Sequence, residues 1–323
     1  MRPHAVAALG GGHGLASTLS ALRFITDDIT AIVTVADNGG SSGRLRSEFG
    51  VLPPGDLRMA LAALCDESEW GHTWRDVLQH RFDGDGPLAG HAVGNLLIVA
   101  LWELLDDPVA GLDLVARLLR ANGRVLPMAA VPLDIEADVT GLDDADPGRV
   151  HVVSGQAEVA TTAGRVQQVR LVPQAPPAYP ESVAAIRSAD WVILGPGSWF
   201  TSVMPHLLVP DLQEALSVTR AHRLLILNLE SRTTETADFT AAGHVDSFAL
   251  NAPGVRLDVV LADPSATDDL DELEAACQRV GATLVLAPMS ARDRVGVHDR
   301  LRLAAALQDI MAQPPTTPRG VAG

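Results

Sequence analysis

Short apolar, β-branched runs alternate with helical segments along this chain, and that alternation limits the fold more than any other feature. The expected strands are residues 5–9, 29–35, 191–194, 224–227, 257–261 and 283–286, and the expected helices include 15–23, 57–65 and 92–105. Strands that are separated by helices form a parallel sheet, because each crossover brings the chain back in the same direction. We therefore expect an α/β protein with a doubly wound, mostly parallel sheet, in which ligands bind at the carboxyl ends of the strands.

Two segments depart from this alternation. Residues 124–174 are rich in Val, Thr, Gln and Glu with alternating polarity, which predicts a small antiparallel β insert. Residues 313–323 are rich in Pro, Thr and Gly, which predicts a disordered tail. A chain of 323 residues can form one large domain or two smaller ones. We assign residues 1–312 to a single α/β domain that carries the insert.

The charge of the chain and its choice of basic residue exclude several function classes. A net charge of −16 argues against a nucleic-acid partner, because nucleic-acid binding depends on basic residues that neutralise phosphates. All 24 basic residues are arginines, so a lysine-containing phosphate loop and lysine Schiff-base chemistry are excluded. A local group of arginines on such an acidic chain fits a small anionic ligand better than a polymer.

Cysteine usage and hydropathy predict the compartment. The two cysteines, Cys65 and Cys277, are far apart, which predicts neither a disulfide framework nor a cysteine-based metal site. The longest apolar stretch, 96–105, is about half a membrane span. The N-terminal apolar run is broken by glycine at position 10, too early for a signal peptide. We therefore expect a cytoplasmic protein without membrane insertion.

A glycine cluster follows the first expected strand and precedes a helix. Glycines let the backbone approach a ligand closely, and the first helical turn offers unpaired N–H groups to an anion. The dinucleotide fingerprint fails, because Leu15 and Ser17 stand where that pattern needs glycine. The expected ligand-binding residues here are Gly10, Gly11, Gly12, His13 and Gly14.

A second glycine-rich segment follows the strand at 29–35. Its Asn38-Gly39 pair could form a hairpin turn, but no second alternating strand follows, so a flexible ligand-binding loop is favoured. The acidic residue at the end of this strand could orient a ribose, a base or a metal. The expected ligand-binding residues are Asp37, Asn38, Gly39, Gly40, Ser41, Ser42 and Arg44.

Two helix starts carry further polar residues. Asp56 is expected to cap a helix, and Arg58 in its first turn opposes the helix dipole, which indicates either a bound anion or a surface salt bridge. His91 and Asn95 open the helix at 92–105, which is apolar all round and therefore expected to be buried. We favour a position of His91 and Asn95 in the ligand cleft over the alternative of a hydrogen-bonded core histidine.

The strand at 191–194 is followed by a third glycine cluster with hydroxyl side chains. Its expected ligand-binding residues are Gly195, Gly197, Ser198, Thr201 and Ser202. Asn228 follows the next strand and is either a ligand contact or a turn residue. No arrangement of Ser, His and Asp or of Cys and His is recognisable, so no catalytic residue is assigned, and no metal-ligand spacing is found.

Five motifs together resemble the YvcK-type gluconeogenesis factor family of the CofD-like superfamily. They are GGGHGL at 10–15, ITAIVTVADNGGSSGRLR at 29–46, PPGDLR at 53–58, GHxxGNLL at 90–97 and GPGSxxTSV at 195–203. The resemblance implies a Rossmann-related, three-layer α/β/α fold in a cytosolic protein that binds UDP-sugars such as UDP-N-acetylglucosamine. It also implies a role in growth on gluconeogenic carbon sources and in the control of cell shape and envelope. We expect no required cofactor.

The sequence departs from the family pattern at two positions. His13 stands where the family usually has threonine, and Asn38 stands where it usually has a second aspartate. The second departure weakens a metal-dependent hypothesis, because two adjacent carboxylates would be a natural site for a divalent cation. We therefore expect no metal.

The 2-phospho-L-lactate transferases of deazaflavin coenzyme synthesis are the alternative family. They share the fold and keep the paired aspartates but lack the Gly-Gly-Ser-Ser-Gly-Arg-Leu-Arg run at 39–46, which favours a binding or regulatory protein over a transferase. A nicotinamide-dependent dehydrogenase is disfavoured by the failed fingerprint. The resemblance is compatible with a homodimer, and it suggests that a Ser/Thr kinase acts on Thr316 or Thr317 in the expected tail.

The loops after successive parallel strands converge on one crevice, which predicts how a UDP-sugar would lie. The nucleoside side is expected to be formed by Gly11, Gly12, Asp37 and Asn38. The phosphates and sugar are expected to be surrounded by Arg44, Arg58, His91, Asn95, Gly197 and Ser198.

Overall fold

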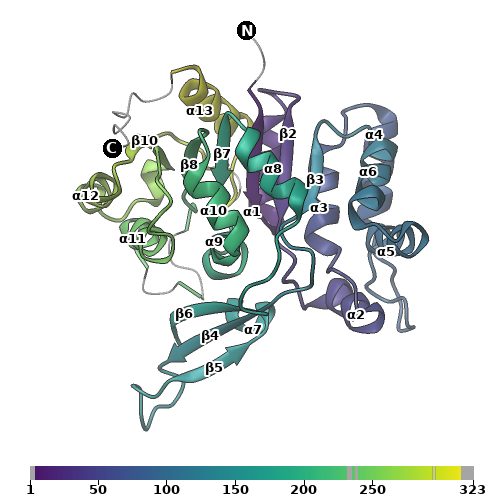
Figure 1. Ribbon diagram of the computed structural model, residues 1–323, viewed down its shortest axis with the longest axis horizontal. Helices are drawn as coiled ribbons and strands as arrows, with labels where there is room; N and C mark the ends of the chain where they lie inside the picture. The colour runs from purple at the N-terminus through teal and green to yellow at the C-terminus, as the bar shows by residue number, and fades with distance from the viewer. Residues whose placement is uncertain (1–3, 231–234, 237–238, 293, 295, 314–323) are drawn as a thin grey trace.

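A seven-stranded parallel sheet forms the centre of the protein, as the computed structural model shows (Figure 1). The structure describes residues 4–230, 235–236, 239–292, 294 and 296–313. The order of the strands across the sheet is β10-β9-β8-β7-β1-β2-β3, and every pairing is parallel. The strands are β1 (Val6–Gly10), β2 (Ile29–Val33), β3 (Arg124–Pro127), β7 (Trp191–Leu194), β8 (His222–Ile226), β9 (Val259–Ala262) and β10 (Thr283–Leu286).

The order of the strands reverses between β1 and β7. From β1 the chain proceeds outward to β2 and β3, and it then returns to the other side of β1 to build β7, β8, β9 and β10. In open parallel sheets such a reversal separates two neighbouring loops at the carboxyl edge and opens a crevice for a ligand. The crevice is therefore expected between the loops that follow β1 and β7.

Helices cover both faces of the sheet and make the doubly wound, three-layer architecture. On one face α1 (Gly12–Leu22) packs between α3 (Gly55–Leu64) and α13 (Arg300–Ala312). On the other face α8 (Pro180–Ser188) packs against α10 (Pro210–Val218), and both lie in front of the strands in Figure 1. The expectation of a mostly parallel α/β fold is thus confirmed.

The remaining helices extend the two ends of the sheet. Beside β3 lie α4 (Glu69–Gln79), α5 (Val93–Leu105) and α6 (Pro108–Leu119), and beside β9 and β10 lie α11 (Ala241–Asn251), η2 (Pro264–Ala266) and α12 (Leu270–Val280). The shorter elements near the carboxyl edge are α2 (Gly40–Phe49), α7 (Gln156–Ala160), η1 (Trp199–Val203) and α9 (Met204–Leu208). No helix among the described residues is both long and apolar enough to cross a bilayer.

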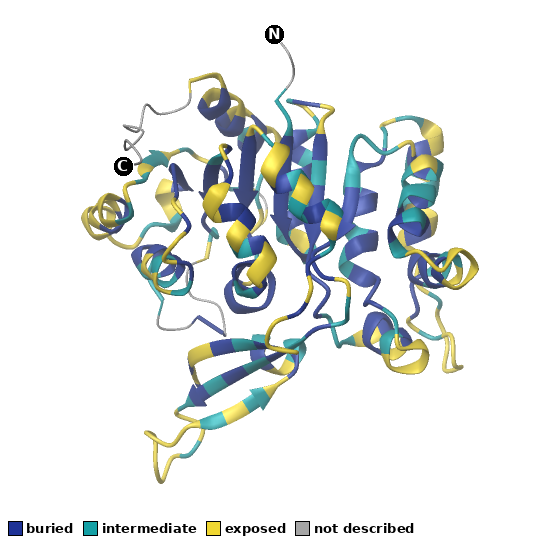
Figure 2. Ribbon diagram, viewed as in Figure 1, coloured by how far each residue is buried: buried dark blue, intermediate teal, exposed yellow. Residues whose placement is uncertain are grey.

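The core lies along the central strands, which are covered on both faces. All residues of β1, β7 and β9 are buried, and Figure 2 shows this layer as a continuous dark blue centre. Sheets covered on both sides need apolar residues at successive positions, which is why these strands were recognisable as short apolar runs. The helix α5 differs from its expectation, because Leu104 is 77% exposed. That helix packs against α4 and α6 beyond the edge of the sheet, so one of its apolar faces stays uncovered.

A three-stranded antiparallel sheet projects from the body below the carboxyl edge (Figure 1). It consists of β4 (Asp134–Thr140), β5 (His151–Ser154) and β6 (Arg165–Val172), with β4 in the middle. The expected insert at 124–174 therefore begins too early. The strand β3 pairs with β2 and belongs to the main sheet, because Val125 and Leu126 bury their side chains in the central core.

The segment at 40–44, expected to be a flexible loop, instead opens the helix α2. Ser41, Ser42 and Gly43 are buried in its first turn, and a side chain at Gly43 would collide with the backbone carbonyl of Asn38. The hairpin alternative is wrong as well, since no strand follows Asn38-Gly39. The tail at 314–323, with Thr316 and Thr317, lies outside the described residues.

Candidate functional site

A cavity of about 360 Å³ lies at the carboxyl edge of the sheet, at the reversal between β1 and β7. Of the ligand-binding residues expected from the sequence, it is lined by Gly11, Gly12, His13, Gly14, Asp56, Gly197, Ser198, Ser202 and Asn228. We call this cavity the switch-point cleft. Its position agrees with the general rule for ligand sites in doubly wound sheets.

The loop after β1 brings the N-terminus of α1 to the floor of the cleft. Gly11 is the residue before the helix, it supplies no side-chain cap, and the first turn carries no acidic residue. The N–H groups of the first turn after Gly12 and the positive end of the helix dipole are therefore available to an anion, whereas the Gly12 N–H faces the carboxyl group of Asp56. Gly12 has a φ of 55°, a left-handed conformation that glycine adopts without strain.

The two glycine loops touch each other backbone to backbone. A Cβ at Gly14 would collide with the carbonyl group of Pro196, so only glycine allows this approach. The Thr18 hydroxyl donates a hydrogen bond of 3.0 Å to the carbonyl oxygen of Gly195, which ties α1 to the loop after β7. These contacts fix the two loops relative to each other before any ligand is bound.

Asn228 holds the loop after β7 through both polar atoms of its amide. The backbone N–H of Gly197 donates to Asn228 Oδ1 at 2.8 Å, and Asn228 Nδ2 donates to the carbonyl oxygen of Gly197 at 2.9 Å. Ser198, exposed at the mouth of the cleft, precedes the π-helical turn η1, and Ser202 within that turn also lines the cleft. Asn228 thus orients the second glycine loop.

Asp56 reaches the cleft from the first turn of α3. Desolvation beneath the glycine loops, followed by the charge of Asp37, raises the pKa of Asp56 to about 7, while the Gly12 N–H and Arg58 oppose the rise. The expectation that Asp56 is an N-cap is wrong, since Pro54 occupies that position. The carboxyl group accepts from the Gly12 backbone of α1 instead of from its own helix.

Four other expected site residues form a buried network behind the cleft lining. Arg58 Nε donates to Asn95 Oδ1 at 2.8 Å, and Asn95 Nδ2 donates to the Ser41 hydroxyl at 3.0 Å. His91 Nδ1 lies 3.0 Å from the same hydroxyl. Burial, followed by the charge of Arg44, lowers the pKa of His91. The network joins α2, α3 and α5, and none of its members is among the described residues that line the cleft.

The loop after β2 is tied to neighbouring segments. Asn38 Nδ2 donates to Glu158 Oε2 at 2.9 Å, and Asn38 Oδ1 accepts from the Ala157 N–H at 3.0 Å, so Asn38 joins this loop to the helix α7 of the insert. The Gly39 N–H donates to Asp37 at 2.9 Å. The exposed Arg44 donates to the carbonyl oxygen of Ala89 at 2.6 Å.

The remaining expected residues surround the cleft without lining it. Gly10 is buried at the end of β1, Gly195 at the end of β7 and Thr201 inside η1. At the start of α2, Gly40 is exposed and Ser42 accepts a hydrogen bond of 2.8 Å from the Gly55 N–H. Contacts of these residues with a ligand stay predictions.

Several cleft residues were missed by the sequence analysis. They are Ser17, Gln156, Pro196, Leu229, Glu230, Gly296, Val297 and His298. Gln156 comes from the insert, and His298 comes from the segment after β10. Burial lowers the pKa of His298 to about 4, and its Nε2 atom is buried without a hydrogen-bond partner among the described residues. The only local signal for His298 was its place after a strand of the sheet.

The described residues contain no group of three or more His, Cys, Asp and Glu side chains arranged to hold a metal ion. Asp37 and Asp56 make a pair of neighbouring carboxyl groups, since the charge of Asp37 is the second cause of the raised pKa of Asp56 after burial. The cleft instead offers backbone N–H groups, hydroxyls and amides, which are donors suited to phosphate and sugar oxygens.

A doubly wound sheet with two glycine loops meeting at its switch point defines a Rossmann-like α/β protein with a candidate ligand cleft. More particularly, the chain belongs to the CofD family: the family model described as "2-phospho-L-lactate transferase CofD" matches residues 6–287.

Curated relatives place the chain with the gluconeogenesis factors of this family. A Mycobacterium leprae protein named "Putative gluconeogenesis factor" is 52% identical over 95% of this chain and 86% of its own length. A Bacillus subtilis protein named "Gluconeogenesis factor" is 38% identical over 82% of this chain and 80% of its own length. A solved Bacillus halodurans structure, described as a member of the UPF0052 family, has a TM-score of 0.83 at 30% identity and covers 95% of this chain and 99% of that chain. The expected family is confirmed.

Proposed function

We propose that this protein is a cytoplasmic gluconeogenesis factor that binds a UDP-sugar of the UDP-N-acetylglucosamine type in the switch-point cleft. The bound sugar nucleotide would report on metabolism and so regulate growth on gluconeogenic carbon sources and cell shape. The observation that carries the proposal is the N-terminus of α1, which has no side-chain cap from Gly11 and no acidic residue in its first turn, facing the Gly197 loop across the switch point. Backbone N–H groups from two loops that face the same cavity are suited to hydrogen-bond the oxygens of a diphosphate.

The polar side chains that line the switch-point cleft suit the sugar of a sugar nucleotide. Ser198, Ser202 and Gln156 offer hydroxyl and amide groups for sugar oxygens, and the unpartnered His298 Nε2 offers one more hydrogen-bonding atom. The raised pKa of Asp56 leaves its neutral form substantially populated near pH 7, which reduces repulsion of an anionic ligand. A cavity of about 360 Å³ lies within the range of small-molecule sites.

Binding without turnover fits the chemistry of the cleft. Among the described residues that line it, no hydroxyl or thiol is hydrogen-bonded to a histidine or carboxylate side chain, which is the arrangement that activates a nucleophile. The described contact between a serine hydroxyl and a histidine ring nitrogen, that of Ser41 with His91, belongs to the buried network outside the cleft lining. The proposal invokes no cofactor and no metal.

Transferase activity is the competing function, because the matching family model carries that description. A thermal-shift screen with UDP-sugars, dinucleotides and guanine nucleotides separates the two. A ligand at about 100 times its Kd stabilises the folded protein by about 2.7 kcal/mol, which a melting curve resolves. Stabilisation by UDP-sugars alone supports the proposal, and stabilisation by guanine nucleotides alone overturns it in favour of the transferase.

Two partners are also proposed from the family resemblance. One is a second copy of the chain in a homodimer, and the other is a Ser/Thr kinase acting on Thr316 or Thr317. A phosphate there would add about −1.5 to −2 charges. Mass photometry tests the dimer, and phosphopeptide mapping after kinase treatment tests the phosphorylation site.

A further inference from the structure

A second cavity, of about 550 Å³, lies beside the switch-point cleft on the face of the sheet that α1, α3 and α13 cover. It runs along α1 and α3, with α4 at one end and the start of α13 at the side. Small side chains, including Ala16, Ser20 and Ala62, leave room between the helices. His13 lines both cavities, which are therefore neighbours. The other residues that line the two cavities are different. We call this second cavity the arginine groove.

Five arginines gather on this groove, although the chain as a whole has a net charge of −16. They are Arg23, Arg58, Arg75, Arg81 and Arg300. Among the described residues that line the groove, Glu67 is the one carboxylate. Such a concentration of like charge opposes folding, since each guanidinium raises the cost of charging its neighbours, and a bound anion would relieve it.

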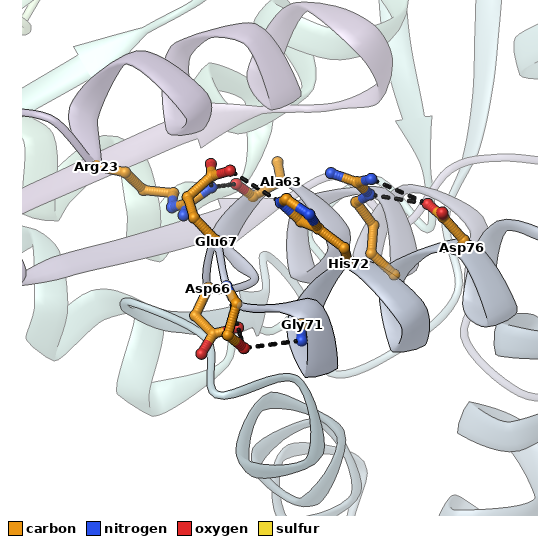
Figure 3. Close-up of polar contacts among 9 residues, drawn as sticks. Arg23, Ala63, Asp66, Glu67, Gly71, His72 and Asp76 are labelled. Atoms are coloured by element: carbon orange, nitrogen blue, oxygen red, sulfur yellow. Dashed lines mark hydrogen bonds and ion pairs between the residues drawn. The ribbon is translucent and has the colours of Figure 1, made fainter.

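The ion pairs at the end of the groove do not neutralise this charge. Glu67 divides its two oxygens between Arg23 NH1 at 3.1 Å and His72 Nε2 at 2.9 Å, as Figure 3 shows. Asp76 contacts Arg75 NH2 at 3.0 Å on the exposed side of α4. Arg81 donates to the backbone carbonyl of Gly90, and no carboxylate within ion-pair distance of Arg58, Arg81 or Arg300 is found among the described residues.

Two buried guanidinium atoms in this groove have no hydrogen-bond partner in the described structure, Arg58 NH1 and Arg23 Nε. Arg58 is only 3% exposed, and its Nε atom is already held by Asn95 Oδ1. The guanidinium plane is therefore fixed, and its NH1 donor is buried without an acceptor. Burial and then the charge of Arg81 lower the pKa of Arg58 to about 10, and the charges of Asp56 and Asp37 offset this fall only in part. Buried donors without acceptors are rare and indicate a missing partner.

We propose that the arginine groove is a second ligand site, which binds a small molecule carrying two or more phosphate groups. Guanidinium groups recognise phosphate oxygens through paired hydrogen bonds, and several arginines can contact one multiply charged ligand. The volume lies within the range of small-molecule sites, and the acidic character of the chain disfavours a nucleic acid. The site is separate from the UDP-sugar cleft and does not depend on its occupancy.

Pyrophosphate is a suitable probe, titrated by calorimetry into the full chain at constant ionic strength. The test variant is Arg75→Gln/Arg81→Gln, which removes two charges from accessible positions. The control is Arg187→Gln, which removes an exposed arginine on α8 that pairs with Glu214 at 3.6 Å, on the opposite face of the sheet. We expect the double variant to bind pyrophosphate about tenfold or more weakly than the wild type, and the control to bind as the wild type does.

The Asn228→Ala variant distinguishes the groove from the cleft, because pyrophosphate could also bind the glycine loops. The groove proposal predicts that this variant keeps a pyrophosphate site that the arginine double variant loses. Equal affinity in the wild type and the double variant overturns the proposal, as does an equal loss in Arg187→Gln. If a single-stranded oligonucleotide binds more tightly than pyrophosphate and loses affinity in the same arginine variant, the groove binds a nucleic acid, and the small-molecule proposal is overturned. If circular dichroism shows that the double variant does not fold, Arg300→Gln replaces it, and this variant is also expected to bind pyrophosphate more weakly than the wild type.

Discussion

The hydroxyl of Thr18 donates a hydrogen bond to the carbonyl oxygen of Gly195, 177 residues further along the chain, at 3.0 Å. This contact joins the helix that follows β1 to the loop that follows β7, across the point where the strand order reverses. The cleft is thus built from backbone held in place by the core, so substitutions that change the backbone spacing should disturb both stability and binding.

Gly14→Ala should lower the free energy of unfolding by about 1–3 kcal/mol, because the new Cβ would collide with the carbonyl group of Pro196. Urea denaturation followed by circular dichroism measures the change. Gly86→Ala is the matched control, since a Cβ at that exposed position would meet nothing within 4 Å. Equal stability of both variants and the wild type would show that the two glycine loops are not in close contact.

Asp56→Asn should change how stability depends on pH. The pKa of Asp56 is raised from 3.8 to about 7, so the unfolded chain loses this proton at lower pH than the folded chain. Wild-type stability therefore falls as pH rises from about 4 to about 7, and the asparagine variant avoids that loss. The difference above pH 7 should be at most about 4 kcal/mol, less where cleft water screens the charge.

Unfolding free energies of wild type and variant across this pH range measure the effect. Asp144→Asn, at an exposed position between β4 and β5, serves as the control and should leave the pH profile unchanged. A wild-type protein that becomes more stable from pH 4 to pH 7 relative to Asp56→Asn would contradict the burial of this carboxyl group.

Asn95→Ala should destabilise the protein by about 1–3 kcal/mol, because it leaves Arg58 Nε without its acceptor and removes a donor to Ser41. Asn251→Ala is the matched control, since that half-buried amide donates within its own helix to Ser247. Thermal unfolding measures both variants. If Asn95→Ala leaves the melting temperature unchanged and weakens only ligand binding, Asn95 contacts the ligand instead of supporting the fold.

Asn38→Asp restores the residue that the related family usually has, and it should lower the melting temperature at neutral pH. The new carboxylate would face Glu158, whose oxygen now accepts a hydrogen bond of 2.9 Å from Asn38. That hydrogen bond is the main cause of the lowered pKa of Glu158. The additional change Glu158→Gln should recover the stability, and differential scanning fluorimetry of the single and double variants tests the pairing. No recovery would mean that the two side chains do not meet.

The strands and glycine loops could be predicted from the sequence because their signals are local. A buried parallel strand is an apolar run, and the loop at Gly10–Gly14 follows one directly. The helix α2 could not be predicted, since glycines and serines at 40–43 have low helix propensity. Contacts from distant segments stabilise it, including the hydrogen bond from the Gly55 N–H to Ser42.

The composition of the cleft was less accessible to sequence reasoning than the fold. Gln156 and His298 line it from the insert and from the segment after β10, and no pattern within either segment indicates where the other lies. His91 and Asn95 were expected in the ligand cleft, but the structure places them in a buried network with Ser41, as the alternative of a hydrogen-bonded core histidine has it. A buried polar residue satisfies its hydrogen bonds wherever the fold supplies partners, and this cannot be read from spacing alone.

The most direct test of the central claim is isothermal titration of UDP-N-acetylglucosamine into the wild type and Asn228→Ala, with chromatography of the nucleotide afterwards. The account predicts saturable binding at one site and no product after long incubation. It also predicts an affinity about tenfold lower in Asn228→Ala, because the Gly197 loop loses both hydrogen bonds that hold it, whereas Asn251→Ala binds as the wild type does. Tight binding of a guanine nucleotide without any response to UDP-sugars, or release of a nucleoside monophosphate when a deazaflavin acceptor is added, would contradict it.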